Sequence, residues 1–116
     1  MNQAERLDRT FAVLSDSTRR AILARLERED GLSVSELARP HAIKLPAVMK
    51  HLDVLADAGL ITRAKTGRVV TVRLQPRPMR EAMEWLRRYE RFWNTSLDRL
   101  TMLAEARETE MRKAGK

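Results

Sequence analysis

The sequence predicts a mainly helical domain with one small β-hairpin, and two periodicities support this fold class. Over most of the 116 residues, apolar side chains recur every three or four positions, which is the period of an amphipathic helix. Residues 60–64 and 69–74 instead are strand-like on either side of a Thr66-Gly67 turn, and in the second run Val70, Val72 and Leu74 alternate with Thr71 and Arg73. The chain length favours a single domain over residues 1–116.

Two helices are expected at the start of the chain. The first covers about 3–14, and its apolar face consists of Leu7, Phe11 and Leu14. The second covers about 17–29, and either Asp16 or Ser17 can cap it, because both side chains accept hydrogen bonds from free backbone N–H groups. Its expected buried stripe is Ala21, Ile22 and Leu26.

Two shorter helices follow before the hairpin. Ser33 and Glu36 match a capping box, which predicts a helix that ends near residue 39. The next helix covers about 45–58, with a proline in its first turn and Gly59 just past its end. Its inward stripe is Val48, Leu52 and Leu55.

After a hinge at residues 75–78, the chain is expected to be helical nearly to its end. Apolar residues alternate three and four apart there, as in a coiled coil. The run Asn94-Thr95-Ser96 is poor helix material, which leaves open whether the helix is continuous or broken near Asn94. The seam consists of Met79, Ala82, Leu86, Tyr89, Trp93, Ser96, Leu100 and Leu103.

Four of the five aromatic residues gather within this last helix. On a monomer they would leave a large exposed apolar patch, so we expect a homodimer interface built from the first and last helices. The expected interface residues are Leu7, Phe11, Trp85, Tyr89, Phe92, Trp93, Leu97 and Leu100. Packing of the cluster on the chain's own first helix is an alternative, and a ligand pocket there stays open.

The positive charge is concentrated on and just after the hairpin. Residues 58–80 hold six basic side chains and no acidic one, whereas the segments on either side are almost neutral. Nearly all of the formal net charge of +7 therefore comes from this stretch. Such a concentration favours binding to a polyanion, although charged side chains can also protect the edge of a sheet.

Several functional classes are not expected from this composition. The chain has no cysteine, and its two histidines, His41 and His51, form no metal-ligand spacing, so neither a metal site nor a cofactor is expected. His51 neighbours the buried stripe and is expected to be a packed side chain. No apolar run is long enough for a membrane span and no signal peptide is visible, which favours a cytoplasmic protein without a membrane partner. No catalytic constellation or Gly-rich phosphate loop predicts an enzyme.

The two short helices and the basic hairpin together predict a winged helix-turn-helix, with the helix-turn-helix over 33–58 and the wing over 60–74. The helix at 45–58 fits the major groove of double-stranded DNA, and the hairpin can contact the backbone or the minor groove. Dimerisation would use residues 1–14 and 79–112. The expected DNA-binding residues are Lys44, Leu45, Ala47, Met49, Lys50, Arg19, Arg20, Arg63, Lys65 and Arg68.

Four segments resemble the ArsR/SmtB family of bacterial winged-helix repressors. They are AVLSDSTRRAIL at 12–23, SELA at 35–38, LPAVMKHL at 45–52 and AGLI at 58–61, and the resemblance covers roughly residues 5–100. It implies a homodimer that binds an inverted-repeat operator and represses its own or a neighbouring operon. A winged helix that binds protein and not DNA is the alternative.

This chain departs from the family pattern at informative positions. Lys44 stands where a capping Ser or Thr is frequent, and Met49 stands where a Ser often contacts DNA. The Cys-x-Cys box of metal-sensing members is missing from residues 33–38, and residues 79–116 contain no His. The resemblance therefore implies the non-metal-sensing branch. The aromatic motif around Tyr89 resembles regulators encoded beside START-like proteins, and a small-molecule effector remains unknown.

Overall fold

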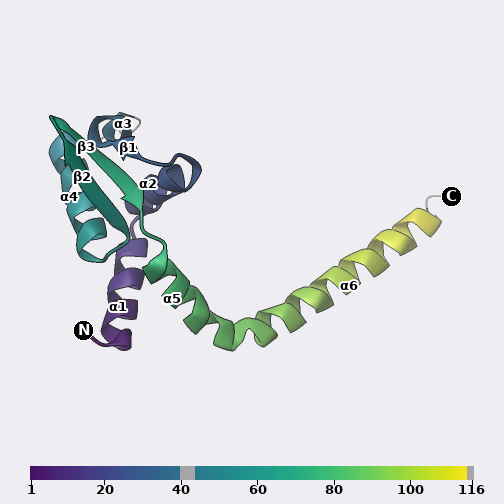
Figure 1. The fold of residues 1–116 in the computed structure, drawn as a ribbon. Coiled ribbons are helices and arrows are strands. Elements are labelled where there is room, and N and C mark those ends of the chain that lie inside the picture. Colours follow the sequence, from purple (N-terminus) through teal and green to yellow (C-terminus); the bar gives the residue numbers. More distant parts are fainter. Residues whose placement is uncertain (40–43, 115–116) are drawn as a thin grey trace. The chain divides into compact units, whose positions relative to one another are not determined.

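The computed structural model describes residues 1–39 and 44–114, and the chain divides into two compact units. The N-terminal unit is Met1–Ala82, and the C-terminal unit begins at Met83. The N-terminal unit contains α1 (Gln3–Leu14), α2 (Ser17–Arg28), β1 (Leu32–Ser33), α3 (Val34–Ala38), α4 (Leu45–Asp57), β2 (Ile61–Thr66), β3 (Val69–Leu74) and the start of α5 (Arg77–Leu86). The rest of α5, a short 3-10 helix η1 (Arg87–Tyr89) and α6 (Glu90–Ala114) form the C-terminal unit. The predicted class, mainly helical with a small hairpin, is confirmed (Figure 1).

The hairpin belongs to a three-stranded antiparallel sheet with the order β1-β3-β2 (Figure 1). Strand β1 was not predicted, because two residues are too few to show an alternation of apolar and polar side chains. The hairpin turn is Gly67-Arg68 and not Thr66-Gly67, since Thr66 still pairs with Val69. Gly67 has a φ of +62° and Arg68 has a negative φ, which matches the two-residue II′ turns that suit the twist of paired strands.

Side chains cap the helices largely as expected. Asp16, and not Ser17, caps α2, because its Oδ1 accepts hydrogen bonds from the N–H groups of Thr18 at 2.9 Å and Arg19 at 3.1 Å. Ser33 Oγ caps α3 by accepting from the Glu36 N–H at 3.1 Å. At the start of α4 the Lys44 side chain makes no capping bond, as its lack of an acceptor predicts.

The end of α4 fixes where the wing begins. Gly59 has a φ of +76°, its N–H bonds the Ala56 carbonyl at 2.9 Å, and the Leu60 N–H bonds the Leu55 carbonyl at 3.0 Å. This is a Schellman motif, which closes a helix and turns the chain sharply. Leu55 and Leu60 are both fully buried, so the motif is anchored in the core and β2 starts at the next residue.

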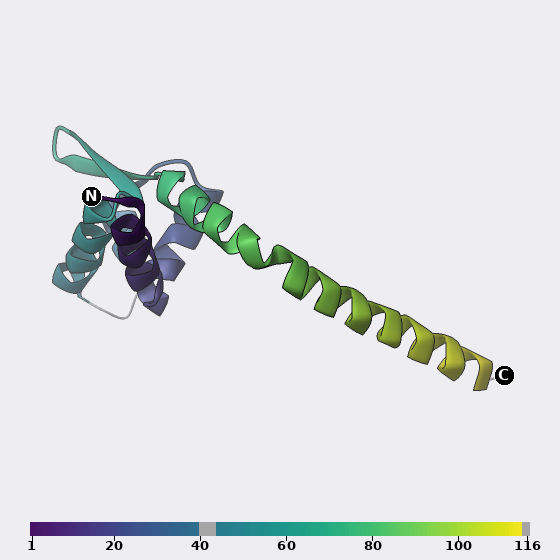
Figure 2. The ribbon, with the colours of Figure 1, turned by 90° about the horizontal axis from the view of Figure 1, so that it is seen from below.

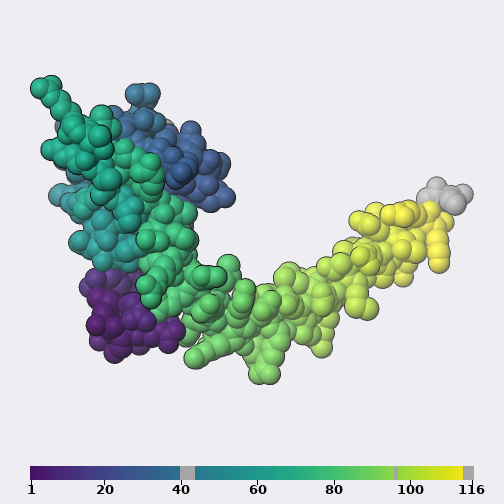
Figure 3. All heavy atoms as spheres, viewed as in Figure 1, coloured from purple at the N-terminus to yellow at the C-terminus, as the bar shows by residue number. Residues whose placement is uncertain are grey.

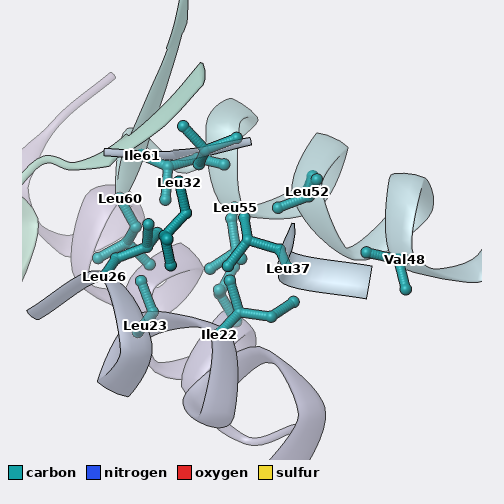
Figure 4. Packing of buried hydrophobic residues seen from close by; sticks show 12 residues of the cluster. Ile22, Leu23, Leu26, Leu32, Leu37, Val48, Leu52, Leu55, Leu60 and Ile61 are labelled. Carbon is teal, nitrogen blue, oxygen red and sulfur yellow. The ribbon is translucent and has the colours of Figure 1, made fainter. Parts of the chain in front are cut away.

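The core lies between α2, α3, α4 and the sheet (Figure 4). The predicted stripe of α4 is confirmed, because Val48, Leu52 and Leu55 are fully buried. In α2 the prediction was wrong at Ala21, which is exposed, whereas Leu23 is buried. The buried face of α2 passes through residues 22, 23 and 26, and a small alanine loses little when it faces water.

The C-terminal helices differ from the prediction at two places. Helix α5 starts at Arg77, two residues earlier than expected, because Pro78 in a first turn lacks only an N–H that would have no helical partner. The helix is interrupted at η1 and not near Asn94. Thr95 stays within α6, where its hydroxyl donates to the Arg91 carbonyl at 2.7 Å. Among the described residues no helix is long and apolar enough to cross a membrane.

The cap of α2 predicts a defined response to acid. Bonds from the Arg19 N–H above all, with the charge of His51 in the same direction, hold the pKa of Asp16 below its ordinary value. The ionised carboxylate therefore stabilises the fold above that ordinary value, and this contribution is lost as the pH falls through the lowered pKa. We expect Asp16→Ala to lower the melting temperature at neutral pH and to have a smaller effect in acid.

Asp16→Asn is the matched control, because asparagine keeps an acceptor for the cap and removes only the titrating charge. Its loss at neutral pH should be smaller than that of Asp16→Ala. Thermal unfolding followed by circular dichroism across the acidic range measures both variants. A deficit of Asp16→Asn that stays constant from neutral to acidic pH would contradict the assignment.

Candidate nucleic-acid interface

One face of α4 is available to a groove of DNA. Because Val48, Leu52 and Leu55 bury the opposite face, the exposed side includes Leu45, Met49, Lys50 and Asp53, with Pro46, Val54 and Asp57 also exposed. Lys44 is also exposed, just before the helix, and Ala47 is half-buried. The residues that the sequence singled out for base contacts thus lie at or near the exposed N-terminal half of α4, apart from the recessed Ala47.

The hairpin extends beyond the helices of the N-terminal unit (Figure 2). Its strands pair from Ile61↔Leu74 to Thr66↔Val69, and after the buried Ile61 every residue of β2 is exposed. Since side chains alternate along a strand, Arg63 and Lys65 lie on the same side of β2 as Ile61. The end of the hairpin projects from this unit in the space-filling view (Figure 3). Arg68, in the turn, is exposed, and it lines a pocket together with residues 33–36 and Met49 of α4.

Tertiary contacts divide the basic residues of the hairpin region into two groups. Arg63 donates to Asp53 Oδ1 at 2.6 Å, and Arg73 lies 3.7 Å from a carboxylate oxygen of Asp30. Lys65 and Arg68 form no ion pair with any carboxylate in the described part of the chain. The uncompensated charge is therefore concentrated at the outer end of the wing.

The guanidinium groups of Arg19 and Arg20 are engaged within the protein. Arg19 donates to the carbonyls of Val13 at 2.8 Å and Ala12 at 3.2 Å, and Arg20 donates to the carbonyl of Leu14 at 2.7 Å. These carbonyls belong to the last turn of α1, whose free acceptors attract cations. Both side chains therefore secure the end of α1. This role was not predicted, although two arginines a few residues beyond the end of a helix are a recognisable signal for it.

His51 is half-buried beside the α4 stripe. Its Nδ1 lies 4.0 Å from Asp16 Oδ1, which is an ion-pair distance only when the imidazole is protonated. His41 lies outside the described residues. Among the described residues no group of three or more His, Cys, Asp or Glu side chains is placed to hold a metal ion.

The C-terminal unit presents many apolar side chains to solvent. Trp85 is half-buried and stacks edge-on against Tyr89, with ring centroids 5.4 Å apart. The exposed apolar residues of this unit are Met83, Leu86, Tyr89, Phe92, Trp93, Leu97, Leu100, Met102, Leu103 and Met111. In the N-terminal unit Phe11 is exposed, but Leu7 is buried. Leu7 therefore has almost no surface to offer a partner, which corrects the expectation for that residue.

These features define a winged helix-turn-helix, a class of DNA-binding transcriptional regulators, and comparisons with known proteins agree. A family described as a helix-turn-helix domain matches residues 14–64. The chain is 35% identical over 99 residues to the HTH-type transcriptional regulator Rv2034 of Mycobacterium tuberculosis, covering 85% of this chain and 89% of that protein. It is 26% identical over 80 residues to the transcriptional repressor SdpR of Bacillus subtilis, covering 69% of this chain and 88% of SdpR.

A solved structure of an ArsR family transcriptional regulator is 41% identical to the chain, with a TM-score of 0.72 over 78% of this chain and 93% of that one. The chain belongs to the ArsR family of helix-turn-helix transcriptional regulators. The predicted family and the predicted DNA-binding function are confirmed, and the relatives are regulators and not enzymes. The comparisons give no support to a protein-binding winged helix.

The unpaired wing charge makes a quantitative prediction. If Arg68 contacts a phosphate, Arg68→Ala should weaken binding to every DNA sequence by about eightfold for each bound copy of the chain at about 0.1 M salt, and the slope of log affinity against log salt should fall by about 0.9 per copy. Fluorescence anisotropy over a salt series measures both quantities. Arg80→Ala is the matched control, because Arg80 is also exposed and forms no ion pair with the described residues, but lies on α5. Equal effects of the two variants would show that the wing has no special role.

Proposed function

We propose that this protein is a homodimeric repressor that binds an inverted-repeat operator in its own or a neighbouring promoter. The observation that carries the proposal is the pair of surfaces on the N-terminal unit: the exposed face of α4 and the unpaired cations at the tip of the wing. Sequence-specific binding requires contacts to base edges in a groove, which α4 can make, and contacts to the phosphates, which the wing can make. The relative SdpR is named a transcriptional repressor, which supports the negative direction of regulation.

The base sequence would be chosen by the N-terminal half of α4. Met49 is 36% exposed and offers an apolar surface that suits a thymine methyl group. Lys44 and Lys50 can reach a guanine edge or a phosphate. Lys65 and Arg68 would bind the sugar-phosphate backbone or the adjacent minor groove without reading the sequence directly. In this assignment α4 recognises the bases, and the wing binds the sugar-phosphate backbone.

A homodimer is proposed from the apolar surface of the C-terminal unit. Trp93, Leu97 and Leu100 follow one another four and three residues apart along α6, so they share one side of that helix, and each is at least 40% exposed. A second copy of the chain would cover this surface. Two-fold symmetry then explains the inverted repeat, with half-sites about one helical turn apart. As a regulator of bacterial promoters, the protein would act in the cytoplasm.

Selection from randomised double-stranded DNA tests the operator. We expect the wild type to enrich an inverted repeat with half-sites centred about ten base pairs apart. Because Met49 would contact a base, Met49→Ala should change the preferred base at one symmetric position and cost about 1–3 kcal/mol there. Arg68→Ala should leave the enriched sequence unchanged. If no symmetric sequence is enriched by the wild type, the operator model is wrong.

Sedimentation of charge-reversal variants tests the dimer. We expect the wild type to sediment as a dimer and Leu97→Glu with Leu100→Glu to raise the dimer dissociation constant by about a hundredfold or more, because two charges would be buried unpaired. Ala106→Glu is the control, since residue 106 lies on the opposite side of α6 at 100° per residue. Helicity by circular dichroism confirms that the variants fold. A stable dimer of the double variant would exclude this interface.

A further inference from the structure

Asp53 is an acidic residue in the middle of the exposed face of α4. It lies one helical turn after Met49, so the two side chains share the face that is proposed to meet DNA. A carboxylate in this place repels phosphate groups, and it weakens the attraction that the wing provides. An acidic side chain at this position therefore needs a structural reason, and its interaction partner supplies one.

The partner of Asp53 is Arg63, on the first strand of the wing. Arg63 Nη1 donates to Asp53 Oδ1 at 2.6 Å, and the two side chains are 31% and 59% exposed. This distance is short even for a charge-assisted hydrogen bond, which is stronger than a neutral one. The bond joins the recognition helix directly to the wing.

The position of Arg63 along β2 determines what the bond does. Ile61 is buried at the base of the wing, Arg63 follows on the same side of the strand, and Lys65 lies further out. The ion pair is thus formed where the wing leaves the core. It links the wing to α4 and engages the guanidinium of Arg63, while Lys65 and Arg68 form no ion pair in the described residues.

We propose that Asp53 is a specificity-determining residue that acts by holding Arg63. The ion pair withdraws one cation from sequence-independent binding to phosphates, which lowers the affinity for DNA at large. It also fixes the position of the wing relative to α4. This preorganisation favours an operator that contacts both elements at once, and it gives no advantage to a random sequence. The net effect is a larger ratio of operator affinity to non-specific affinity. The inference rests on the proposed use of α4 and the wing together on one operator.

The salt dependence of binding separates a held cation from a free one. Each phosphate that a cation neutralises adds about 0.9 to the slope of log affinity against log salt. If Arg63 is held by Asp53, Arg63→Gln should leave the slope on non-specific DNA unchanged, in contrast to Arg68→Ala. For each bound copy of the chain, Asp53→Asn should release Arg63, steepen that slope by about 0.9 and tighten non-specific binding about eightfold at about 0.1 M salt.

The experiment compares operator and random duplexes with the full-length protein. Asp53→Asn should lower the ratio of operator to non-specific affinity, because the released cation helps both duplexes while the lost brace harms only the operator complex. In the double variant Asp53→Asn with Arg63→Gln, the slope on random DNA should return to the wild-type value while the ratio stays reduced. Asp57→Asn is the matched control, since Asp57 is an exposed carboxylate of the same helix without an ion pair in the described residues. It should leave both slope and ratio unchanged.

Three results would overturn the inference. The first is a drop in slope for Arg63→Gln as large as that for Arg68→Ala, which would make Arg63 an ordinary phosphate contact. The second is an Asp53→Asn variant with wild-type slope and ratio. The third is an Asp53→Asn variant whose only change is the preferred base at one position, which would make Asp53 a direct reader of a base. A wild type without operator preference would instead contradict the proposed function.

Discussion

The burial of one face of α4 is the constraint on which the rest of this structure depends. Val48, Leu52 and Leu55 are fully enclosed by α2, α3 and the sheet, so the helix cannot rotate without exposing them. Burying such side chains contributes about 1.5–3 kcal/mol each, which outweighs any single surface interaction of α4. The rotation of the helix, and with it the outward direction of Met49, Lys50 and Asp53, follows from the core.

The same core positions the wing. Leu55 and Leu60 anchor the Schellman motif at the end of α4, and Ile61 is buried at the first residue of β2. The wing therefore starts from a fixed point, and the Arg63–Asp53 bond adds a second connection further out. Base contacts are assigned to α4 and backbone contacts to the wing. The Schellman motif and the Arg63–Asp53 bond, which connect the two elements, decide how they are placed relative to each other.

How much could be predicted from the sequence depends on the range of the interactions involved. Gly59, Ser33 and the α4 stripe act within a few residues along the chain, and their roles were predicted correctly. The exposure of Ala21, the burial of Leu7 and the strand β1 depend on distant partners, and these were missed. Composition left the continuity of the helix near Asn94 open. In the structure the Thr95 hydroxyl donates to the Arg91 carbonyl and α6 continues through this run, while the interruption lies at η1.

For the candidate site, the sequence by itself determined the segments: an amphipathic helix, then a hairpin in a stretch of 23 residues without an acidic side chain. Local periodicity and composition suffice for that. Only the tertiary structure decided which charges stay unpaired, because Asp30 and Asp53 come from outside the stretch to meet Arg73 and Arg63. It likewise turned Arg19 and Arg20 toward the end of α1. The sequence determines which residues are charged, but whether a charged side chain is available to DNA depends on the residues that the fold places beside it.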